Sequence, residues 1–353
     1  MPYAVIDKGS NYFDTNLYTG NNTARNITLN FSPDFVWIRS RDTAGTNHFL
    51  QDSVRGTSKI IYSNLTNAET TFTDGYVSSF NSDGYSLTTD TTGYMNYNSR
   101  TYVGWSWRGS DSSAVSNTQG SITSTVSANT TSGFSIVSYT GNGTAGATVG
   151  HGLGVAPKMI IVKNRSSAGT EWITYHASIG NGKYLALQST AGQAGTVTIW
   201  GTSSTTFTLA QAYSDYNGNG NNLIAYCFAE VKGFSKFGSY NGNGNADGTF
   251  VYTGFSPAWL MIKESSAAGA QWYMYDNKRS TYNLVNAILY PNLSNAEGSG
   301  LNQFDFYSNG FKARSSNTDT NNSGSTYIYA CFASNPFVSS KGVAVTARWF
   351  GLS

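Results

Sequence analysis

One pattern of residues recurs three times, in the same order, along this chain of 353 residues. Its first landmark is a Tyr-(Thr/Asn)-Gly-Asn turn, found at 18–21, 139–142 and 240–243. Next comes a proline that opens an apolar run and stands six residues before a basic residue. The copies of this run are 33–39, 157–163 and 257–263. Internal repetition at this spacing means that one supersecondary unit is used several times.

Two further landmarks complete each copy, an aromatic run and a closing strand. The aromatic runs are 49–52, 172–176 and 272–276, and the closing strands are 101–107, 222–228 and 326–332. The outer copies also share Asn-Leu-(Thr/Ser)-Asn-Ala-Glu, at 64–69 and 292–297, which the middle copy lacks. A triplicated unit can imitate a trimer within one chain, with the divergent middle copy between its neighbours.

Each copy consists of short runs rich in Val, Ile, Thr, Tyr, Phe and Trp, separated by Gly, Asn, Asp and Ser turns. This alternation is typical of an all-β sandwich or jelly roll. We therefore expect three tandem jelly-roll or β-sandwich repeats of about 100 residues. The predicted boundaries are 1–110, 133–233 and 234–353, with a linker at 109–132. Helix is expected only as a turn near 67–69 and near 295–297.

The apolar runs and the junctions carry two further expectations. Val36-Trp37-Ile38 and Ile160-Ile161-Val162 lack polar alternation, which indicates strands covered on both faces. The polar segment 109–132 is either an extended tether or an edge strand through 122–126. The second junction, 230–237, is short and partly apolar, so repeats two and three are expected to pack together more tightly than one and two.

Charge is scarce, at 11% of residues, and the formal net charge is +2. The nearest approach to a basic cluster is Arg39, Arg41 and Arg55, which is too small a footprint for nucleic acid. No run approaches the ~18 apolar residues of a membrane span. The first residues show no secretory signal, so we expect synthesis in a cytosol without standard export.

Reactive and metal-binding residue types are few. Cys227 and Cys331 lie in related apolar runs and are expected to be small core residues without a disulfide. The best metal candidate is Asp215, Asn217 and Asn219, which fits the first half of a calcium loop. Its twelfth position is Tyr226 instead of glutamate, so a plain β-turn is favoured.

No catalytic set emerges. The histidines are His48, His151 and His176, and His176 takes the position that Asp52 and Asp276 hold in the other copies. Recurrence gives the acids Asp52, Asp276, Asp83, Glu69 and Glu297 a structural explanation as parts of the turn framework. No nucleophile elbow or dinucleotide fingerprint is present. We therefore expect a protein that is not an enzyme, without catalytic residues or cofactors.

Two groups of aromatic residues are candidates for binding. Tyr94, Tyr97, Tyr213 and Tyr216 lie in turn-rich segments beside Asn and Asp, where exposed rings stack on sugars. The alternative is that they cap sandwich edges or fill an intersubunit contact. The terminal segment 342–353 is apolar for a chain end and contains Trp349, Phe350 and Leu352. We expect it to dock on a partner chain or a sister subunit.

Several strings carry a resemblance to a known family. They are 133–143, 150–158, 229–240 and 329–337, which include Gly-His-Gly-Leu-Gly and Tyr-Ala-Cys-Phe-Ala-Ser-Asn-Pro-Phe. Together they resemble a tandem domain of unknown function in tail-fibre-like and other virion proteins of marine bacteriophages, of the cyanophage type. The resemblance covers nearly the whole chain and offers no catalytic or binding residues to transfer.

The resemblance implies a virion structural protein on the particle exterior, assembled in the host cytoplasm. A tail fibre, spike or knob component that assists host attachment is the first expectation, and a capsid decoration protein is the alternative. A carbohydrate-binding module is the alternative of another class. The implied partners are other virion proteins and a host surface glycan, with a homo-oligomer, preferably a trimer, and neither nucleic acid nor membrane insertion.

Overall fold

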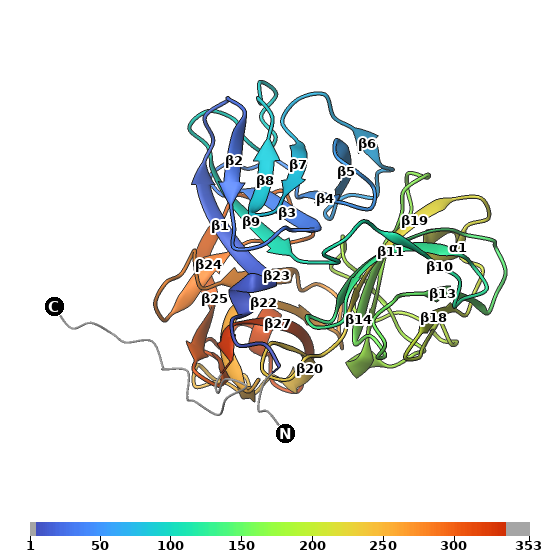
Figure 1. Ribbon diagram of the computed structural model, residues 1–353. Helices are drawn as coiled ribbons and strands as arrows, with labels where there is room; N and C mark the ends of the chain where they lie inside the picture. Colours follow the sequence, from blue (N-terminus) through green and yellow to red (C-terminus); the bar gives the residue numbers. More distant parts are fainter. Residues whose placement is uncertain (1–4, 337–353) are drawn as a thin grey trace.

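The computed structural model describes residues 5–336, and these residues form an all-β protein with several antiparallel sheets (Figure 1). The all-β expectation is confirmed. We call residues 5–108 unit 1, residues 109–229 unit 2 and residues 230–336 unit 3. In Figure 1 the three units form three lobes, blue to cyan, green to yellow, and orange to red.

Each unit contains a larger and a smaller sheet. The larger sheet of unit 1 has the order β1 (Phe13–Thr19), β9 (Thr101–Trp107), β3 (Phe35–Ser40), β4 (Phe49–Asp52), β5 (Lys59–Tyr62) and β6 (Thr70–Thr71). The smaller one has the order β2 (Arg25–Thr28), β8 (Gly84–Leu87) and β7 (Val77–Asn81). The first strand therefore pairs with the last, which closes the unit on itself.

Units 2 and 3 repeat the order of the first four strands of the larger sheet, but in unit 3 that sheet ends there and the smaller sheet gains a fourth strand. In unit 2 it is β12 (Phe134–Thr140), β19 (Asn222–Phe228), β14 (Met159–Asn164), β15 (Trp172–His176) and β16 (Leu185–Ala186), with β13 (Ala147–Gly150), β18 (Thr206–Leu209) and β17 (Trp200–Thr202). In unit 3 it is β20 (Ser235–Asn241), β27 (Thr326–Pro336), β22 (Phe255–Glu264) and β23 (Trp272–Asp276), with β21 (Phe250–Tyr252), β26 (Gly310–Ala313), β25 (Gly298–Tyr307) and β24 (Val285–Ile288).

The segment 109–132 is not a free tether. It forms β10 (Val115–Asn117) and β11 (Ser124–Asn129), and β11 pairs with the outer edge of β12. Ile122 makes a bridge to Val149 of the smaller sheet of unit 2. The edge-strand alternative is therefore the correct one, although the strand begins at Ser124.

The predicted helical turns are in the wrong places. Residues 67–69 and 295–297 form neither helix nor turn, and the last residue of each segment bonds through its backbone to a neighbouring unit. Glu69 N donates to Arg165 O at 2.9 Å, and Glu297 N donates to Arg41 O at 2.6 Å. Within residues 5–336 the helical turns are the 3₁₀ turns η1 (Gly9–Asn11) and η2 (Ala177–Ile179) and the α-turns α1 (Ser214–Asn217) and α2 (Thr318–Asn321).

The central strands are buried on both faces, as the apolar runs predict. In β3, Val36 and Ile38 face the core of their own unit, whereas Phe35 and Trp37 belong to a core shared by all three units. In β14, Ile160 and Ile161 divide in the same way. The absence of polar alternation thus has a physical cause, because one face fills a sandwich and the other faces the shared core.

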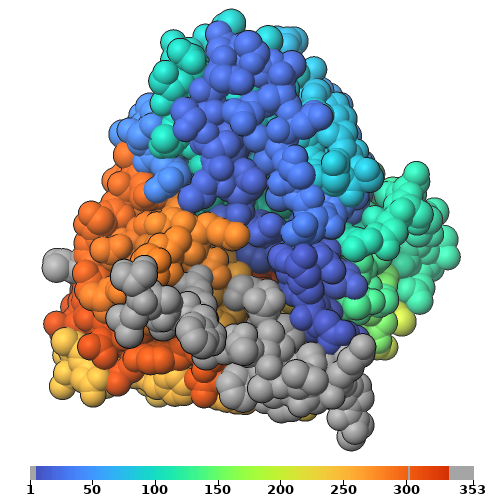
Figure 2. Space-filling model, turned by 60° about the vertical axis from the view of Figure 1, so that its left-hand side comes forward, coloured from blue at the N-terminus to red at the C-terminus, as the bar shows by residue number. Residues whose placement is uncertain are grey.

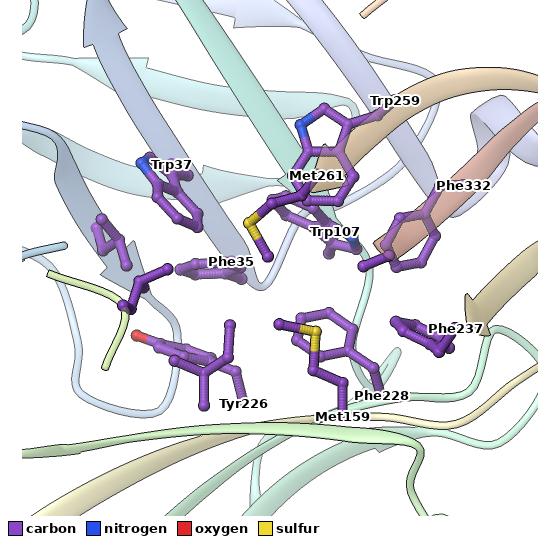
Figure 3. A pocket seen from close by; sticks show the side chains of 14 residues that line it. Phe35, Trp37, Trp107, Met159, Tyr226, Phe228, Phe237, Trp259, Met261 and Phe332 are labelled. Carbon is purple, nitrogen blue, oxygen red and sulfur yellow. The ribbon is translucent and has the colours of Figure 1, made fainter. Parts of the chain in front are cut away.

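The shared core is a cluster of aromatic and methionine side chains that point toward one another from the three units (Figure 3). Trp107 lies among rings of every unit, with centroid distances of 5.3 Å to Phe35, 6.3 Å to Phe228 and 5.6 Å to Trp259. The free space is only about 10 Å³ and its lining is apolar, so it has room for at most one water. This is a packed core and not a ligand pocket.

The Tyr-x-Gly-Asn turn depends on a buried asparagine that lies elsewhere in each unit. In unit 2, Asn217 Oδ1 accepts a hydrogen bond from Asn142 N at 3.2 Å, and Tyr139 Oη donates to Tyr216 O at 2.7 Å. The same asparagine–amide contact is made by Asn96 with Asn21 and by Asn321 with Asn243. The turn must therefore approach the asparagine segment closely.

This close approach explains the glycine of the turn and predicts the effect of changing it. A Cβ at Gly141 would lie 2.4 Å from Gly218 O, a backbone atom that no rotamer change can move. We expect Gly141→Ala to lower the free energy of unfolding by about 3 kcal/mol. In contrast, a Cβ at Gly182 would meet nothing closer than 3.7 Å. Urea denaturation should therefore show Gly182→Ala near wild type, and equal effects of the two variants would contradict the explanation.

Candidate functional site

The groups with functional chemistry gather where one unit meets the next, and we therefore take these three boundaries as the candidate site. At each boundary the basic residue one position before the end of a central strand reaches a loop of the neighbouring unit. Lys163 Nζ donates to Thr66 O of unit 1 at 3.1 Å, and Lys263 Nζ donates to Thr190 O of unit 2 at 3.3 Å. Arg39 Nη2 donates to Ser294 O of unit 3 at 2.9 Å.

These contacts close a ring, because unit 2 binds unit 1, unit 3 binds unit 2, and unit 1 binds unit 3. The last contact joins residues about 255 positions apart. In Figure 2 atoms of unit 1 lie directly on those of unit 3, without a gap between the blue and orange surfaces. The three units thus form a single closed assembly in one chain.

Burial affects the titration of the two lysines but does not make them nucleophiles. It lowers the pKa of Lys163 and of Lys263 to about 8. A lysine with a lowered pKa can attack carbonyl carbon when it faces a substrate. Here Lys163 Nζ also donates to Thr170 O at 2.6 Å, and Lys263 Nζ to Ala270 O at 3.0 Å. Both amines are fixed by protein oxygens, and their role is to clamp loops.

A buried cluster of charges crosses the boundary between units 1 and 2. Asp52 and Arg55 form an ion pair of 2.5 Å in which neither side chain is exposed. Glu69 joins Arg55 at 3.0 Å and Arg165 of unit 2 at 2.9 Å. Burial would raise the pKa of Glu69, but the two guanidinium groups lower it overall. Tyr226 of unit 2 donates to Asp52 Oδ2 at 2.8 Å and completes the cluster.

The boundary between units 3 and 1 has the same cluster with different partners. Asp276 and Arg279 form a fully buried ion pair of 2.5 Å. Glu297 joins Arg279 at 3.1 Å and Arg41 of unit 1 at 2.8 Å. Trp105 of unit 1 donates its indole N–H to Asp276 Oδ2 at 3.0 Å, in the place of the tyrosine hydroxyl.

The boundary between units 2 and 3 is neutral at every matching position. His176 and Ile179 stand where the other units have Asp and Arg, and Gln193 stands where they have Glu. Gln193 N donates to Ser265 O at 2.8 Å, which is the backbone contact that Glu69 and Glu297 make at the other boundaries. Ser265 thus replaces the arginine of the neighbouring unit. All four ionic positions have changed together, which keeps buried charge paired or absent.

His176 is a buried neutral imidazole. Its Nδ1 accepts from Ser178 N at 3.2 Å, so Nε2 carries the proton and donates to Tyr329 O of unit 3 at 3.1 Å. Burial lowers its pKa to about 4. The sequence prediction that this position is structural agrees with these contacts.

This histidine should make the protein sensitive to acid. Below pH 6.5 the unfolded chain binds a proton that folded His176 binds only near pH 4, so stability falls as the pH drops through this window. Between pH 7 and pH 4 we expect the wild type to lose about 3 kcal/mol more than His176→Gln, which keeps a donor for Tyr329 O. Urea denaturation at both pH values measures this difference. Equal losses would show that His176 does not titrate as its burial implies.

The other two histidines are also buried and hydrogen-bonded within the protein. His48 Nδ1 accepts from the Trp37 indole N–H at 2.9 Å, and His151 Nδ1 accepts from Leu153 N at 3.1 Å. Burial lowers the pKa of both. Within residues 5–336, no three His, Cys, Asp or Glu side chains come together in a way that would hold a metal ion.

The calcium candidate is placed on α1 and the turn after it. Asp215 Oδ1 accepts from Glu171 N at 2.7 Å, and the Asn217 amide is buried, with Nδ2 donating to Thr144 O at 2.9 Å. Asn219 packs against Gly143 of the Tyr-x-Gly-Asn turn. Asn217 is thus turned inward to hold that turn, and its side chain does not point toward a common centre with Asp215.

The four tyrosines proposed to contact glycans do not form one surface. Tyr216 is fully buried, because the single turn α1 directs it inward, where its hydroxyl donates to Ile199 O at 3.2 Å. Its assignment as an exposed ring is wrong. Tyr94 is half-buried and stacks on Phe72 at 4.1 Å. Tyr97 and Tyr213 are exposed, but they belong to units 1 and 2 respectively.

The remaining predicted residues are the two cysteines and the three apolar residues of the terminal segment. Cys227 and Cys331 are buried free thiols whose pKa burial raises, as expected of core residues. Trp349, Phe350 and Leu352 lie outside the described residues. No helix in the described part of the chain is long and apolar enough to cross a membrane.

Sequence reasoning missed the residues that matter most at the boundaries. Arg55 and Arg279 follow the recurring Asp52 and Asp276 by three residues, so the repeated Asp-x-x-Arg was a usable signal. Arg41, one member of the supposed basic cluster, is instead the partner of Glu297. The buried asparagines were visible only as a residue that recurs in otherwise dissimilar segments.

A single family model covers all three units. It is described as a domain of unknown function, DUF7483, and it matches residues 8–336. The chain belongs to this family. The match runs through both unit junctions, in agreement with three units that close into one DUF7483 domain. No curated protein and no solved structure matches this DUF7483 chain.

Proposed function

We propose that this DUF7483 protein is a non-enzymatic structural component of a bacteriophage particle exterior, of the tail fibre, spike or knob type, which assists host attachment. The closed ring of units is the observation that supports this proposal best. Every buried ionic group described above joins one unit to the next, so these groups hold the three units rigidly together. The three units are, in this proposal, copies of one β-sandwich related by an approximate threefold axis.

The surface is consistent with a component that meets salt water and proteases. Only 11% of residues are charged, and buried ion pairs are screened by salt much less than exposed ones. The phage assignment itself derives from the sequence resemblance described above. Partners in this proposal are other virion proteins, a homotrimer of this chain and a host surface glycan.

Capsid decoration is the alternative proposal, and the same closed ring of units supports it. A chain whose units already surround a threefold axis can occupy a threefold site on a shell as a single copy, since symmetric sites match symmetric patches. On this alternative no homotrimer is required. The threefold arrangement alone therefore leaves both positions, tail and head, open to experiment.

The test is to locate the chain on particles. Phage particles whose genome carries this gene are purified, and a specific antibody with a gold label is used in electron microscopy. Label on tail tips or fibres supports the attachment role, and label over the head supports decoration. Particles that contain no trace of the chain by mass spectrometry would overturn both.

A further inference from the structure

The outer face of the smaller sheet in unit 3 differs from the matching faces of units 1 and 2. Tyr252 of β21 and Tyr307 of β25 flank Gly310 of β26 in one row across three strands. Adjacent strands lie about 4.8 Å apart, so the two tyrosine backbones are about 10 Å apart on the same face. Their exposed fractions are 52% and 37%, although both are large rings on a folded domain.

A third aromatic ring, that of Phe250, reaches from the next row into the space beside Gly310. Phe250 is 45% exposed, and its ring tip lies 3.0 Å from the position that a Gly310 Cβ would take. Its centroid is 5.9 Å from that of Tyr307. Gly310 thus leaves the space into which Phe250 leans. The three rings, Phe250, Tyr252 and Tyr307, make one continuous surface, which we call the aromatic platform.

Polar groups border the aromatic platform on two sides. In the next row Phe250 pairs with Lys312, and Lys312 pairs with Asp305, whose Oδ2 accepts from Tyr307 Oη at 3.0 Å. Beyond Tyr252 lies a hollow of about 150 Å³, whose polar lining includes Glu230, Ser235, Lys236 and Thr253. Hydrogen-bond donors and acceptors therefore stand at the margins of an apolar surface.

Unit 1 shows what this face looks like without rings. The matching positions are Asn26, Thr28 and Asn81, because Thr28 and Asn81 flank Gly84 as Tyr252 and Tyr307 flank Gly310. Ser86 links two of these residues by hydrogen bonds. Its Oγ donates to Asn26 Oδ1 at 2.7 Å and accepts from Asn81 Nδ2 at 2.9 Å. Three large apolar rings are therefore not needed to build this face.

Unit 2 covers its matching strand with its own chain. Thr148 of β13 corresponds to Phe250, and its hydroxyl accepts from Ser121 N at 2.9 Å. Ser124 Oγ donates to Gly150 O at 2.8 Å. Residues 120–124 thus lie along this edge. Among the described residues, large rings remain exposed on this face only in unit 3.

From these observations we infer that the aromatic platform of unit 3 binds carbohydrate, with pyranose rings stacked on Phe250, Tyr252 and Tyr307. A sugar ring has an apolar face that stacks on an aromatic side chain, and its hydroxyls need hydrogen bonds at the rim. Asp305, Lys312 and the lining of the hollow supply such groups. Lys312 already pairs with Asp247, and Asp305 already pairs with Arg314. A carboxylate accepts several hydrogen bonds and an ammonium donates three, so both groups keep capacity for sugar hydroxyls, which a purely hydrophobic partner would not use.

The inference rests on the proposed function only for the source of the sugar, which is then a host surface glycan. The two can fail separately. If the chain binds glycans but is absent from particles, the proposed function fails and the aromatic platform stands. If it is present on particles but binds no glycan, the reverse holds.

The experiment uses the full chain, labelled and applied to an array of neutral and acidic pyranose glycans, with affinities for the retained glycans then measured by calorimetry. The test variant is Phe250→Asn with Tyr252→Thr and Tyr307→Asn, which installs the residues of unit 1. The control is Tyr282→Thr, which removes an exposed tyrosine of unit 3 that is not part of the aromatic platform. Thermal melting checks that both remain folded.

We expect the wild type to bind a subset of the glycans, the test variant to lose roughly tenfold or more in affinity, and the control to stay within about twofold. A variant ending at residue 336 is assayed in parallel, so that coverage by the terminal segment is detected. The inference is overturned if neither the full nor the shortened chain binds any glycan, or if the test variant binds as well as the wild type. It is also overturned if the test variant dissociates an oligomer, because the face would then join copies of this chain.

Discussion

Replacing Trp107 by alanine should destabilise all three units together, by about 3–5 kcal/mol. The indole is buried in the shared core, within 6.4 Å of rings from units 1, 2 and 3, including Phe134 and Phe332. Its loss leaves a cavity that no unit can fill alone. Urea denaturation followed by both far-ultraviolet circular dichroism and tryptophan fluorescence measures the change in the free energy of unfolding.

The same experiment tests whether the ring is one cooperative structure. If it is, both signals of the wild type change in a single transition, and Trp107→Ala moves that transition as a whole. Tyr213→Ala, an exposed ring of unit 2, is the control and should stay within about 0.5 kcal/mol. Separate transitions for one unit and for the other two would contradict a shared core, whatever the size of the loss.

The strands could be predicted from the sequence because their signals are local. Each proline-led apolar run became a central strand, and the lack of polar alternation in Val36-Trp37-Ile38 correctly indicated burial on both faces. What covered the second face could not be predicted. Periodicity describes one strand and its own sheet, whereas Trp37 faces side chains of units 2 and 3 that lie more than a hundred residues away.

The candidate site was less predictable, for two physical reasons. Exposure in a turn-rich segment is decided by a few backbone angles, so a single turn of helix exposes Tyr213 and buries Tyr216 three residues later. Charge partners are set by the arrangement of units. Asp52 and Glu69 recur as expected, but only the packing of one unit against the next shows that Glu69 pairs with Arg165 and that Glu297 pairs with Arg41.

The charged and neutral boundaries lead to the second large effect. Arg55→Ile removes the guanidinium from a cluster in which Asp52 is fully buried, and it copies Ile179 of unit 2. We expect a loss of about 3–5 kcal/mol, because an uncompensated charge stays in the interior. Changing Asp52→His as well copies a second neutral position, while Glu69 keeps Arg165 as its partner. The double variant should recover about 1–3 kcal/mol of the loss.

Two comparisons make this prediction decisive. The same pair of changes at the other charged boundary, Asp276→His with Arg279→Ile, should follow the same order of stabilities, because its geometry matches. Arg108→Ala breaks an ion pair whose partner Asp111 is two-thirds exposed, and it should cost less than about 1 kcal/mol. If the double variants are less stable than the single ones, histidine at this position is tolerated only beside Tyr329 and Ser178. Each unit boundary would then tolerate only its own set of charged or neutral side chains, because the strand that faces the boundary determines which side chains fit.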